Sequence, residues 1–256
     1  MAFSRISVLC PSRLAMAATS PGRELYVERA IRSIRWQSAW TDVDWEIVVG
    51  VDPGRVIEAR DRLGDVPVVV EGDGPGQAAA VNAAFRAATG DIIALLEDDD
   101  VWHWQKIAIQ LCVLREKPAA RFVSANQMEV DLAGGVARLN DFATPSGWLM
   151  HREIWDAVGP LNESFRWHID NEWLGRLSAR GISRMHLLEQ SGQSRALFPT
   201  LARRTTVRET GERFPLVLRE VHADAATVRI ARDPASRQQS WDEYHRMIES
   251  FGEIPW

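Results

Sequence analysis

The sequence predicts an α/β fold in a single domain, with a mostly parallel central sheet covered by helices on both faces. Short apolar strands alternate with helical segments from residue 6 to residue 96, and polar residues follow the strands at the points where they end. The composition agrees, because 256 residues with 46% hydrophobic and 25% charged side chains suit one large globular domain with a sizeable core.

Two helices are predicted among the early strands. The first begins at Glu24, and its Val27, Ile31 and Ile34 recur on one face at helical spacing. The second is an alanine-rich helix over residues 77–88. Buried strands are predicted over residues 6–10, 45–51, 66–70 and 91–96. Strands and helices that alternate at this spacing imply a parallel sheet.

Polar residues follow three of these strands directly. They are Pro11-Ser12-Arg13, Asp52 and Glu97-Asp98-Asp99-Asp100. In open parallel sheets, ligands bind beyond the carboxyl ends of the strands. We therefore expect these three groups to surround one binding site.

The second half of the chain is less regular. Strands are predicted over residues 121–130, 147–151 and 185–188, helices over 152–158, 171–179 and 241–251, and a loop at Gly134-Gly135. From residue 191 the chain is rich in arginine and its pattern is weak. We therefore predict a domain over residues 1–190, with residues 191–256 as a helical or irregular extension of the same domain.

Composition excludes several classes of protein. The formal net charge of −5 argues against a general nucleic-acid binder, which carries a basic surface. Cys10 and Cys112 lie in apolar runs, which favours two unpaired thiols in a reducing compartment. We expect no signal peptide and no membrane span, because no apolar run approaches about 18 residues. A cytoplasmic location follows, with contact at the inner face of the membrane left open.

The run Glu97-Asp98-Asp99-Asp100 is the strongest local signal. Four neighbouring carboxylates repel one another, and gathering them at a strand end favours a bound cation. Their oxygen atoms suit Mg²⁺ or Mn²⁺. The alternative is helix capping, because a helix is predicted over residues 102–115 and acids favour its first turn. Capping explains Asp99 or Asp100, but not all four acids.

Tryptophan is unusually frequent, with 11 residues against 2 tyrosines. Six lie in the middle of the chain: Trp102, Trp104, Trp148, Trp155, Trp167 and Trp173. Indole faces stack on the apolar faces of sugars, but they also pack well in protein cores. For any single tryptophan the core interpretation is favoured.

Taken together, the order of these motifs resembles family 2 glycosyltransferases of the GT-A fold, over roughly residues 5–190. The similar segments include a first strand ended by Pro11 and an acid cluster followed by Trp102. They span residues 6–13, 29–37, 46–52, 76–82, 87–91, 94–102, 159–163 and 170–181. The resemblance implies a GT-A-type Rossmann-like domain, with a nucleotide-sugar half over 1–100 and an acceptor half over 101–190.

The resemblance also implies a reaction and its residues. A sugar would move from a nucleoside-diphosphate sugar to an acceptor hydroxyl with inversion, with the help of Mn²⁺ or Mg²⁺. Asp170 matches the general base, and Asp99, with Glu97, matches the metal ligands. Asp52 would contact the nucleotide base. The other residues implied to bind the nucleotide sugar are Pro11, Ser12, Arg13, Asn82, Glu97 and Asp98. The acceptor would be a glycan, a lipid-linked molecule or a small molecule.

Several residues depart from the family pattern. Glu97 replaces the usual aspartate, Val81 stands where many members have a basic residue, and Ile169 replaces the usual glutamate before the base. The segment over residues 14–22 is longer than usual. These departures concern substrate identity more than reaction type.

Alternatives stay open for the acceptor half. Asp170 precedes a predicted helix and would also serve as its N-cap. Trp148, His168 and Glu172 are acceptor-side candidates, although a lone histidine is more often structural. His186 and His222 are possible further metal ligands without a supporting motif.

Two other functions compete with glycosyl transfer. A sugar nucleotidyltransferase would need a glycine-rich basic loop after the first strand, which residues 11–22 lack. A non-catalytic module that binds nucleotide sugars or glycans would keep the fold, but it would not need both Asp99 and Asp170. The Arg203-Arg204 region is interpreted as a solvated face, with a diphosphate clamp or an anionic lipid contact as the sharper alternative.

Overall fold

A computed structural model describes residues 4–18, 22, 24–37, 42–64, 68–131, 136–190 and 205–255. The predicted loop at Gly134-Gly135 and the Arg203-Arg204 region lie outside these residues. Across the described part of the chain, no helix is both long and apolar enough to cross a membrane. Cys10 and Cys112 are free, as predicted.

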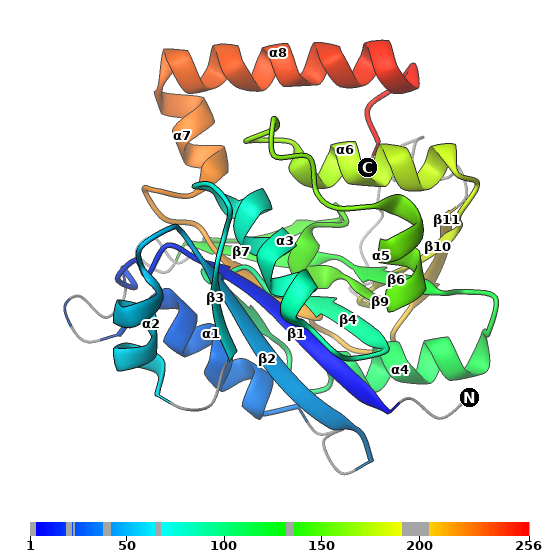
Figure 1. Ribbon diagram of the computed structural model, residues 1–256. Helices are drawn as coiled ribbons and strands as arrows, with labels where there is room; N and C mark the ends of the chain where they lie inside the picture. Colours follow the sequence, from blue (N-terminus) through cyan, green and yellow to red (C-terminus); the bar gives the residue numbers. More distant parts are fainter. Residues whose placement is uncertain are drawn as a thin grey trace.

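The centre of the molecule is an eight-stranded sheet in the order β11-β10-β6-β9-β4-β1-β2-β3 (Figure 1). Its strands are β1 (Arg5–Ser12), β2 (Asp44–Val51), β3 (Val68–Glu71), β4 (Ile92–Leu95), β6 (Phe122–Ala125), β9 (Leu149–His151), β10 (Arg184–Leu188) and β11 (Thr205–Glu209). All neighbours pair in parallel except β9, which runs antiparallel to both β4 and β6. The predicted mostly parallel sheet is therefore confirmed.

Helices cover both faces of this sheet. They are α1 (Tyr26–Arg35), α2 (Val56–Leu63), α3 (Gln77–Ala87), α4 (Lys106–Glu116), α5 (Arg152–Val158), α6 (Ile169–Ala179), α7 (Ala226–Arg232) and α8 (Pro234–Phe251). A short 3₁₀ turn spans Pro145–Gly147. In β1, Ile6, Val8 and Cys10 pack in one core with α1 and α4, whereas Leu9 packs in the other with α3 and α6. This alternation is the two-residue period of a strand buried on both faces.

A second sheet has four strands in the order β5-β12-β7-β8. They are β5 (Asp100–Trp102), β7 (Gln127–Asp131), β8 (Val136–Asn140) and β12 (Val217–Glu220). The strand predicted over 121–130 is divided by Asn126, so that β6 belongs to the first sheet and β7 to the second. The helix predicted over 102–115 begins later, at Lys106, because residues 100–102 pair with β12.

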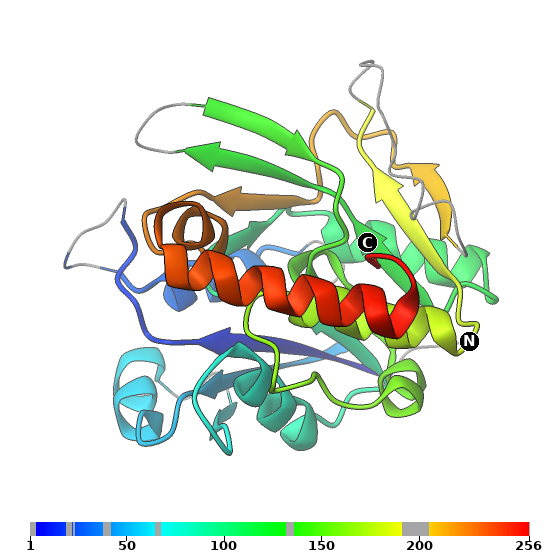
Figure 2. The same cartoon turned by 90° about the horizontal axis from the view of Figure 1, so that it is seen from above.

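The part after residue 190 contributes strands as well as helices. Within the described residues, β11 extends the main sheet and β12 joins the second sheet, and the sequence predicted neither. Helix α8 crosses over α6 (Figure 2). Gly175 of α6 allows this close approach, because a Cβ there would clash with the ring of Phe251. The boundary between residues 190 and 191 stays a prediction.

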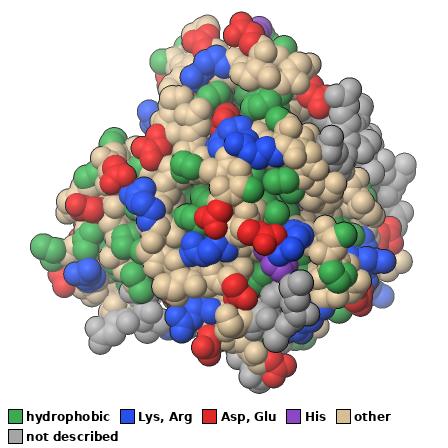
Figure 3. All heavy atoms as spheres, turned by 45° about the vertical axis from the view of Figure 1, so that its right-hand side comes forward, with side chains coloured by type: hydrophobic (Ala, Val, Ile, Leu, Met, Phe, Trp, Pro, Cys, Tyr) green, Lys and Arg blue, Asp and Glu red, His purple; other side chains and the backbone are tan. Residues whose placement is uncertain are grey.

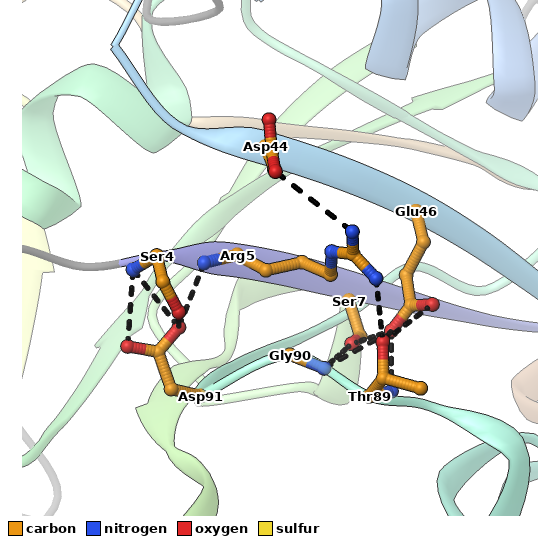
Figure 4. A network of polar contacts seen from close by, with 8 residues as sticks. All are labelled: Ser4, Arg5, Ser7, Asp44, Glu46, Thr89, Gly90 and Asp91. Atoms are coloured by element: carbon orange, nitrogen blue, oxygen red, sulfur yellow. Dashed lines mark hydrogen bonds and ion pairs between the residues drawn. The ribbon is translucent and has the colours of Figure 1, made fainter.

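At the end of the sheet where β1 begins, a polar network ties three segments together (Figure 4). The Glu46 carboxylate accepts hydrogen bonds from the backbone N–H groups of Thr89 (2.5 Å) and Gly90 (3.0 Å) and from the Ser7 hydroxyl. Asp91 accepts the N–H of Arg5 at 2.8 Å. This network lies at the end of the sheet where β1 and β4 begin, whereas the site described below lies at the end where they finish. The network therefore stabilises the sheet and is not part of the site.

Candidate functional site

A cavity of about 490 Å³ opens at the carboxyl ends of β1, β2 and β4. Its wall on the strand side consists of Pro11, Ser12, Arg13, Asp52, Pro75 to Ala80, Glu97, Asp98 and Asp99. Its other wall consists of Glu163 to Trp167, Ile169, Arg219, Asp224, Ala226, Arg229 and Gln239. The three polar groups that the sequence placed after strands are thus brought together in one cavity, with the exception of the buried Asp100.

Three hydrogen bonds shape the strand side of the cavity. The Ser12 hydroxyl donates to Asp98 Oδ2 at 2.7 Å and accepts the N–H of Leu14 at 3.0 Å. Leu14 has a positive φ of 55°, a left-handed conformation that non-glycine residues adopt rarely. Asp52 Oδ1 accepts the N–H of Gly76 at 2.8 Å, which holds the turn that precedes α3. The chain beyond each strand is therefore fixed by polar contacts at the cavity wall.

Helix α1 holds the loop that follows the acid cluster. The Ser33 hydroxyl accepts the N–H of Trp102 at 3.1 Å, and Gln37 Nε2 donates to the carbonyl of His103 at 3.1 Å. Arg29 Nη2 donates to the carbonyl of Asp99, also at 3.1 Å. These contacts give a physical reason for serine and glutamine at the end of this helix.

The acid cluster does not converge on one point. Glu97 accepts a hydrogen bond from Gln77 Nε2 at 2.5 Å, and Asp98 accepts one from Ser12. Asp99 Oδ2 lies 3.0 Å from His222 Nε2, while Asp100 is fully buried. Among the residues that the structure describes, no group of three or more His, Cys, Asp or Glu side chains is placed to hold a metal ion.

Burial and mutual repulsion govern the ionisation of these acids. Burial, followed by the charge of Asp99, raises the pKa of Glu97 to about 7 and that of Asp98 to about 6. The same causes raise the pKa of Asp100 well above its usual value. Burial also acts to raise the pKa of Asp99, but the hydrogen bond from His222 and the charge of Arg219 lower it overall. Asp99 is thus the acid most stabilised as a carboxylate.

His222 and Arg219 come from the segment around β12. The His222 ring stacks on Tyr26 of α1 with 4.7 Å between ring centroids, and its side chain is 7% exposed. Arg219 lines the cavity, and the charges of Asp100, Glu97 and Asp99 favour its protonated form although burial alone would lower its pKa. On the face drawn in Figure 3, acidic and basic side chains and a histidine are mixed near the middle. Charge compensation from within the protein therefore stabilises part of the cluster.

Asp170 is the second residue of α6, whose N-cap is His168. The alternative in which Asp170 is the N-cap is therefore wrong, because the helix begins at Ile169, two residues before its predicted start at residue 171. Asp170 is not among the residues that line the cavity, but Trp167 and Ile169 are, and its charge acts on Glu97. Burial raises the pKa of Asp170, although hydrogen bonds from backbone N–H groups offset part of this effect.

The sequence model of the family described as "Glycosyl transferase family 2" matches residues 21–155, more than half of the 256 residues. The chain belongs to glycosyl transferase family 2. An uncharacterized glycosyltransferase of Nostoc sp. is 38% identical to this chain over 91 residues. That stretch covers 32% of the chain and 26% of the relative, so the chain matches about a quarter of the curated relative's length.

Solved glycosyltransferases share the fold. A mannosyltransferase from Pyrobaculum calidifontis, in complex with GDP-Man and Mn²⁺, has a TM-score of 0.61 at 16% identity, with 98% of this chain and 65% of that chain covered. S. aureus TarS in complex with UDP-GlcNAc has a TM-score of 0.59 at 12% identity, with 96% and 73% covered. These neighbours are GT-A glycosyltransferases, and the predicted GT-A fold is confirmed.

Besides Asp170, four predicted site residues lie outside the cavity. Asn82 of α3 uses its amide on the loop after α5, with Nδ2 donating to Leu161 O (3.0 Å) and Glu163 Oε1 (2.8 Å). Trp148 is fully buried and donates from Nε1 to Ala143 O at 2.7 Å. Asn82 therefore braces a loop that carries Glu163 to the cavity, and Trp148 belongs to the core. The substrate-binding roles of both residues stay predictions.

The other two are His168 and Glu172. The ring nitrogens of His168 lie 3.3 Å from Asn171 Oδ1 and 2.8 Å from Ser240 Oγ. Glu172 is 7% exposed and pairs with Arg176 at 2.8 Å. These groups are therefore engaged within the protein, and the acceptor-side roles of both residues stay predictions.

Of the two histidines considered as further metal ligands, only one lies near the acids within the described residues. His186 is fully buried, with its ring nitrogens 2.8 Å from Ser124 Oγ and 2.9 Å from Asp141 O. His222 lies at Asp99. Sequence reasoning did not single out the cavity residues Gln77, Arg219 and Arg229, because no local motif marks them. Trp167 was noted only as one of six similar tryptophans.

Proposed function

We propose that this glycosyltransferase transfers a hexosyl group from a nucleoside-diphosphate sugar to an acceptor hydroxyl, with inversion at the anomeric carbon, and with Asp170 as general base. The observation that carries the proposal is the single cavity at the carboxyl ends of β1, β2 and β4, which gathers Ser12, Asp52 and the acids after β4. In a family 2 chain, this is the place where the fold presents ligand-binding residues.

The donor is proposed to lie along the strand side of the cavity. Asp52 would accept hydrogen bonds from the nucleotide base, and Pro11, Ser12 and Arg13 would line the same region. Glu97 and Asp98 line the same side of the cavity and would contact the donor as well. The solved neighbours in complex with GDP-Man and UDP-GlcNAc support a nucleotide-sugar donor.

We also propose a divalent cation, Mn²⁺ or Mg²⁺, held by Asp99 and His222. The residue types fit such an ion, because a carboxylate oxygen of Asp99 lies 3.0 Å from His222 Nε2, and a bound cation would replace the hydrogen bond between them. Two protein ligands suffice where substrate phosphate oxygens and water complete the coordination. When bound, the cation would offset negative charge on the leaving nucleoside diphosphate. Glu97 is the weaker second ligand, because Gln77 already engages its Oε1.

Asp170 is proposed to take the proton from the attacking acceptor hydroxyl. Burial raises its pKa, and a base with a raised pKa holds a proton more readily in the transition state. A single displacement assisted by one base inverts the anomeric carbon. NMR of the first-formed product tests this point, because a retained configuration would rule out the single displacement.

Calorimetry of nucleoside diphosphates tests the proposed donor and cation site. Wild type should bind at least one nucleoside diphosphate in Mn²⁺, and EDTA should abolish most of that affinity. Asp99→Ala should lose the difference between Mn²⁺ and EDTA without a change in melting temperature. Asp242→Ala, which removes an exposed acid of α8, is the matched control. Equal affinity in Mn²⁺ and EDTA for the wild type would contradict the cation.

A further inference from the structure

The wall of the cavity that faces the strands is formed mainly by the segment before α6 and by residues of α7 and α8. None of the proposed donor contacts uses this wall. Its central side chain is Trp167, a half-buried indole whose Nε1 lies 3.3 Å from Gln239 Oε1 of α8. A hydrogen bond to a second helix gives this indole a defined orientation at the cavity wall.

Two guanidinium groups meet the same indole ring. Arg166 lies 5.1 Å from the ring centroid, and Arg229 of α7 lies 5.5 Å from it. Both distances fall within the range of about 6 Å over which a cation is attracted to an aromatic face. Two positive charges from separate elements are therefore brought next to one flat apolar surface.

The guanidinium groups of Arg166 and Arg229 have N–H donors that a ligand could use. Within the described residues, neither guanidinium forms a salt bridge, and Asp233 adds only a weaker, exposed charge near Arg229. In contrast, Arg219 in the same cavity faces the acid cluster and Glu129. Planar guanidinium groups pair with phosphate through two parallel hydrogen bonds.

Two acidic residues on the same wall limit how much negative charge a ligand there would carry. The Glu163 carboxylate accepts a hydrogen bond from Asn82, and Asp224 also lines the cavity. The wall is therefore mixed in charge, which suits a ligand with both hydroxyl groups and one anionic group better than a polyanion. Trp167 and Ile169 both line the cavity, so this indole lies on the segment that leads directly to the proposed base Asp170.

We propose that Trp167, Arg166 and Arg229 form an acceptor subsite for a hydroxylated molecule that carries a phosphate group. The proposal rests on the proposed glycosyl transfer and names its acceptor class. The apolar face of the acceptor lies on the indole, and its phosphate bonds to the two guanidinium groups. The phosphate belongs either to a free small molecule or to a lipid headgroup.

The test measures binding of glycerol 3-phosphate and of glycerol by calorimetry, with a saturating nucleoside diphosphate and Mn²⁺ to fill the donor region. Glycerol 3-phosphate should bind at least about tenfold more tightly than glycerol, since a hydrogen bond to a charged group has this size. Arg166→Gln and Arg229→Gln should each lower the affinity by a similar factor. Arg232→Gln, an exposed arginine of α7 outside the cavity, is the matched control and should bind as the wild type does.

A second arm uses phosphatidylcholine vesicles with and without phosphatidic acid. Binding that depends on phosphatidic acid and is lost in both variants assigns the phosphate to a lipid, whereas binding of glycerol 3-phosphate alone assigns it to a free molecule. Equal binding of glycerol and glycerol 3-phosphate, together with no vesicle binding, would overturn the subsite. So would a loss of nucleoside diphosphate affinity in the two variants, because the arginines would then serve the donor. If the wild type binds no nucleoside diphosphate, the proposed function fails, but the phosphate titration without nucleotide still tests the subsite.

Discussion

Glu243 of α8 provides the most quantitative test of how the C-terminal helix supports the site. Its side chain is fully buried and accepts three consecutive backbone N–H groups, those of Arg166 (2.8 Å), Trp167 (2.8 Å) and His168 (3.1 Å). This segment leads into α6 and carries part of the cavity wall. One carboxylate thus fixes the chain immediately before Asp170.

The magnitude follows from those three hydrogen bonds. A buried donor left without a partner costs about 1–3 kcal/mol. Water reaches part of this segment, because Arg166 is exposed and Trp167 is half-buried, so the lower end applies to each N–H group. We expect Glu243→Ala to lower the free energy of unfolding by about 3–4 kcal/mol, or about 6–16 °C in melting temperature for a domain of this size. Glu243→Gln keeps one accepting oxygen and should lose about half as much.

Urea unfolding followed by circular dichroism measures both values. Glu249→Ala removes an exposed carboxylate from the same helix and should stay within about 0.5 kcal/mol of the wild type. Nucleoside diphosphate affinity should persist in Glu243→Gln, because the donor contacts come from other elements. A loss below about 1 kcal/mol in Glu243→Ala, matching the control, would refute the clamp.

Two further predictions concern the interior and the donor site. Lys106 is fully buried, with Nζ 2.7 Å from Gln110 Oε1 and 4.1 Å from the Trp102 ring centroid, and burial lowers its pKa well below the usual value. Because the pKa of Lys106 is lower in the folded than in the unfolded protein, the free energy of unfolding should rise with pH between these two pKa values. Lys106→Met should remove that rise, measured by urea unfolding at pH 7 and 9. The same rise in the variant as in the wild type would contradict this prediction. Asp52→Ala should weaken nucleoside diphosphate binding about tenfold and leave its Mn²⁺ dependence intact, since Asp52 lies at the end of β2 apart from Asp99; equal calorimetric affinity would disprove the assignment.

The strands and helices of the first half could be predicted because their signals are local. Apolar runs such as the one in β4 are long enough to identify a buried strand without knowledge of its partners. Strand β5 escaped prediction for the opposite reason. It has three residues, and its pairing partner β12 lies more than a hundred positions further along the chain. Its formation moved the start of α4 from the predicted residue 102 to Lys106.

The strand side of the cavity was predictable for a topological reason. Parallel strands bring their carboxyl ends to one edge, so Ser12, Asp52 and Asp99 had to meet there. The opposite wall depends on contacts between distant segments. His222 reaches Asp99 across 123 positions, and nothing in its neighbours marks it.

The tryptophans show the same limit at the level of single residues. Trp148 and Trp167 look alike in the sequence, yet the first is fully buried in the core and the second lines the cavity. The burial of each indole depends on which helix packs over it, and the position of α8 is known only from the three-dimensional structure. Asn82 likewise has a side chain that would suit ligand binding, but its amide forms hydrogen bonds with the backbone of the loop after α5.

The turnover number of Asp170→Asn tests the central claim most directly, measured as release of nucleoside diphosphate in the presence of donor sugar and acceptor. Asparagine keeps the size of the side chain, and the lost charge in the first turn of α6 should cost only about 0.3–1 kcal/mol of stability. Loss of a general base should lower kcat by about 10²–10⁴-fold while nucleoside diphosphate affinity holds. Asp156→Asn, at an exposed position of α5, should turn over as the wild type does. Near-normal turnover in Asp170→Asn would contradict the account.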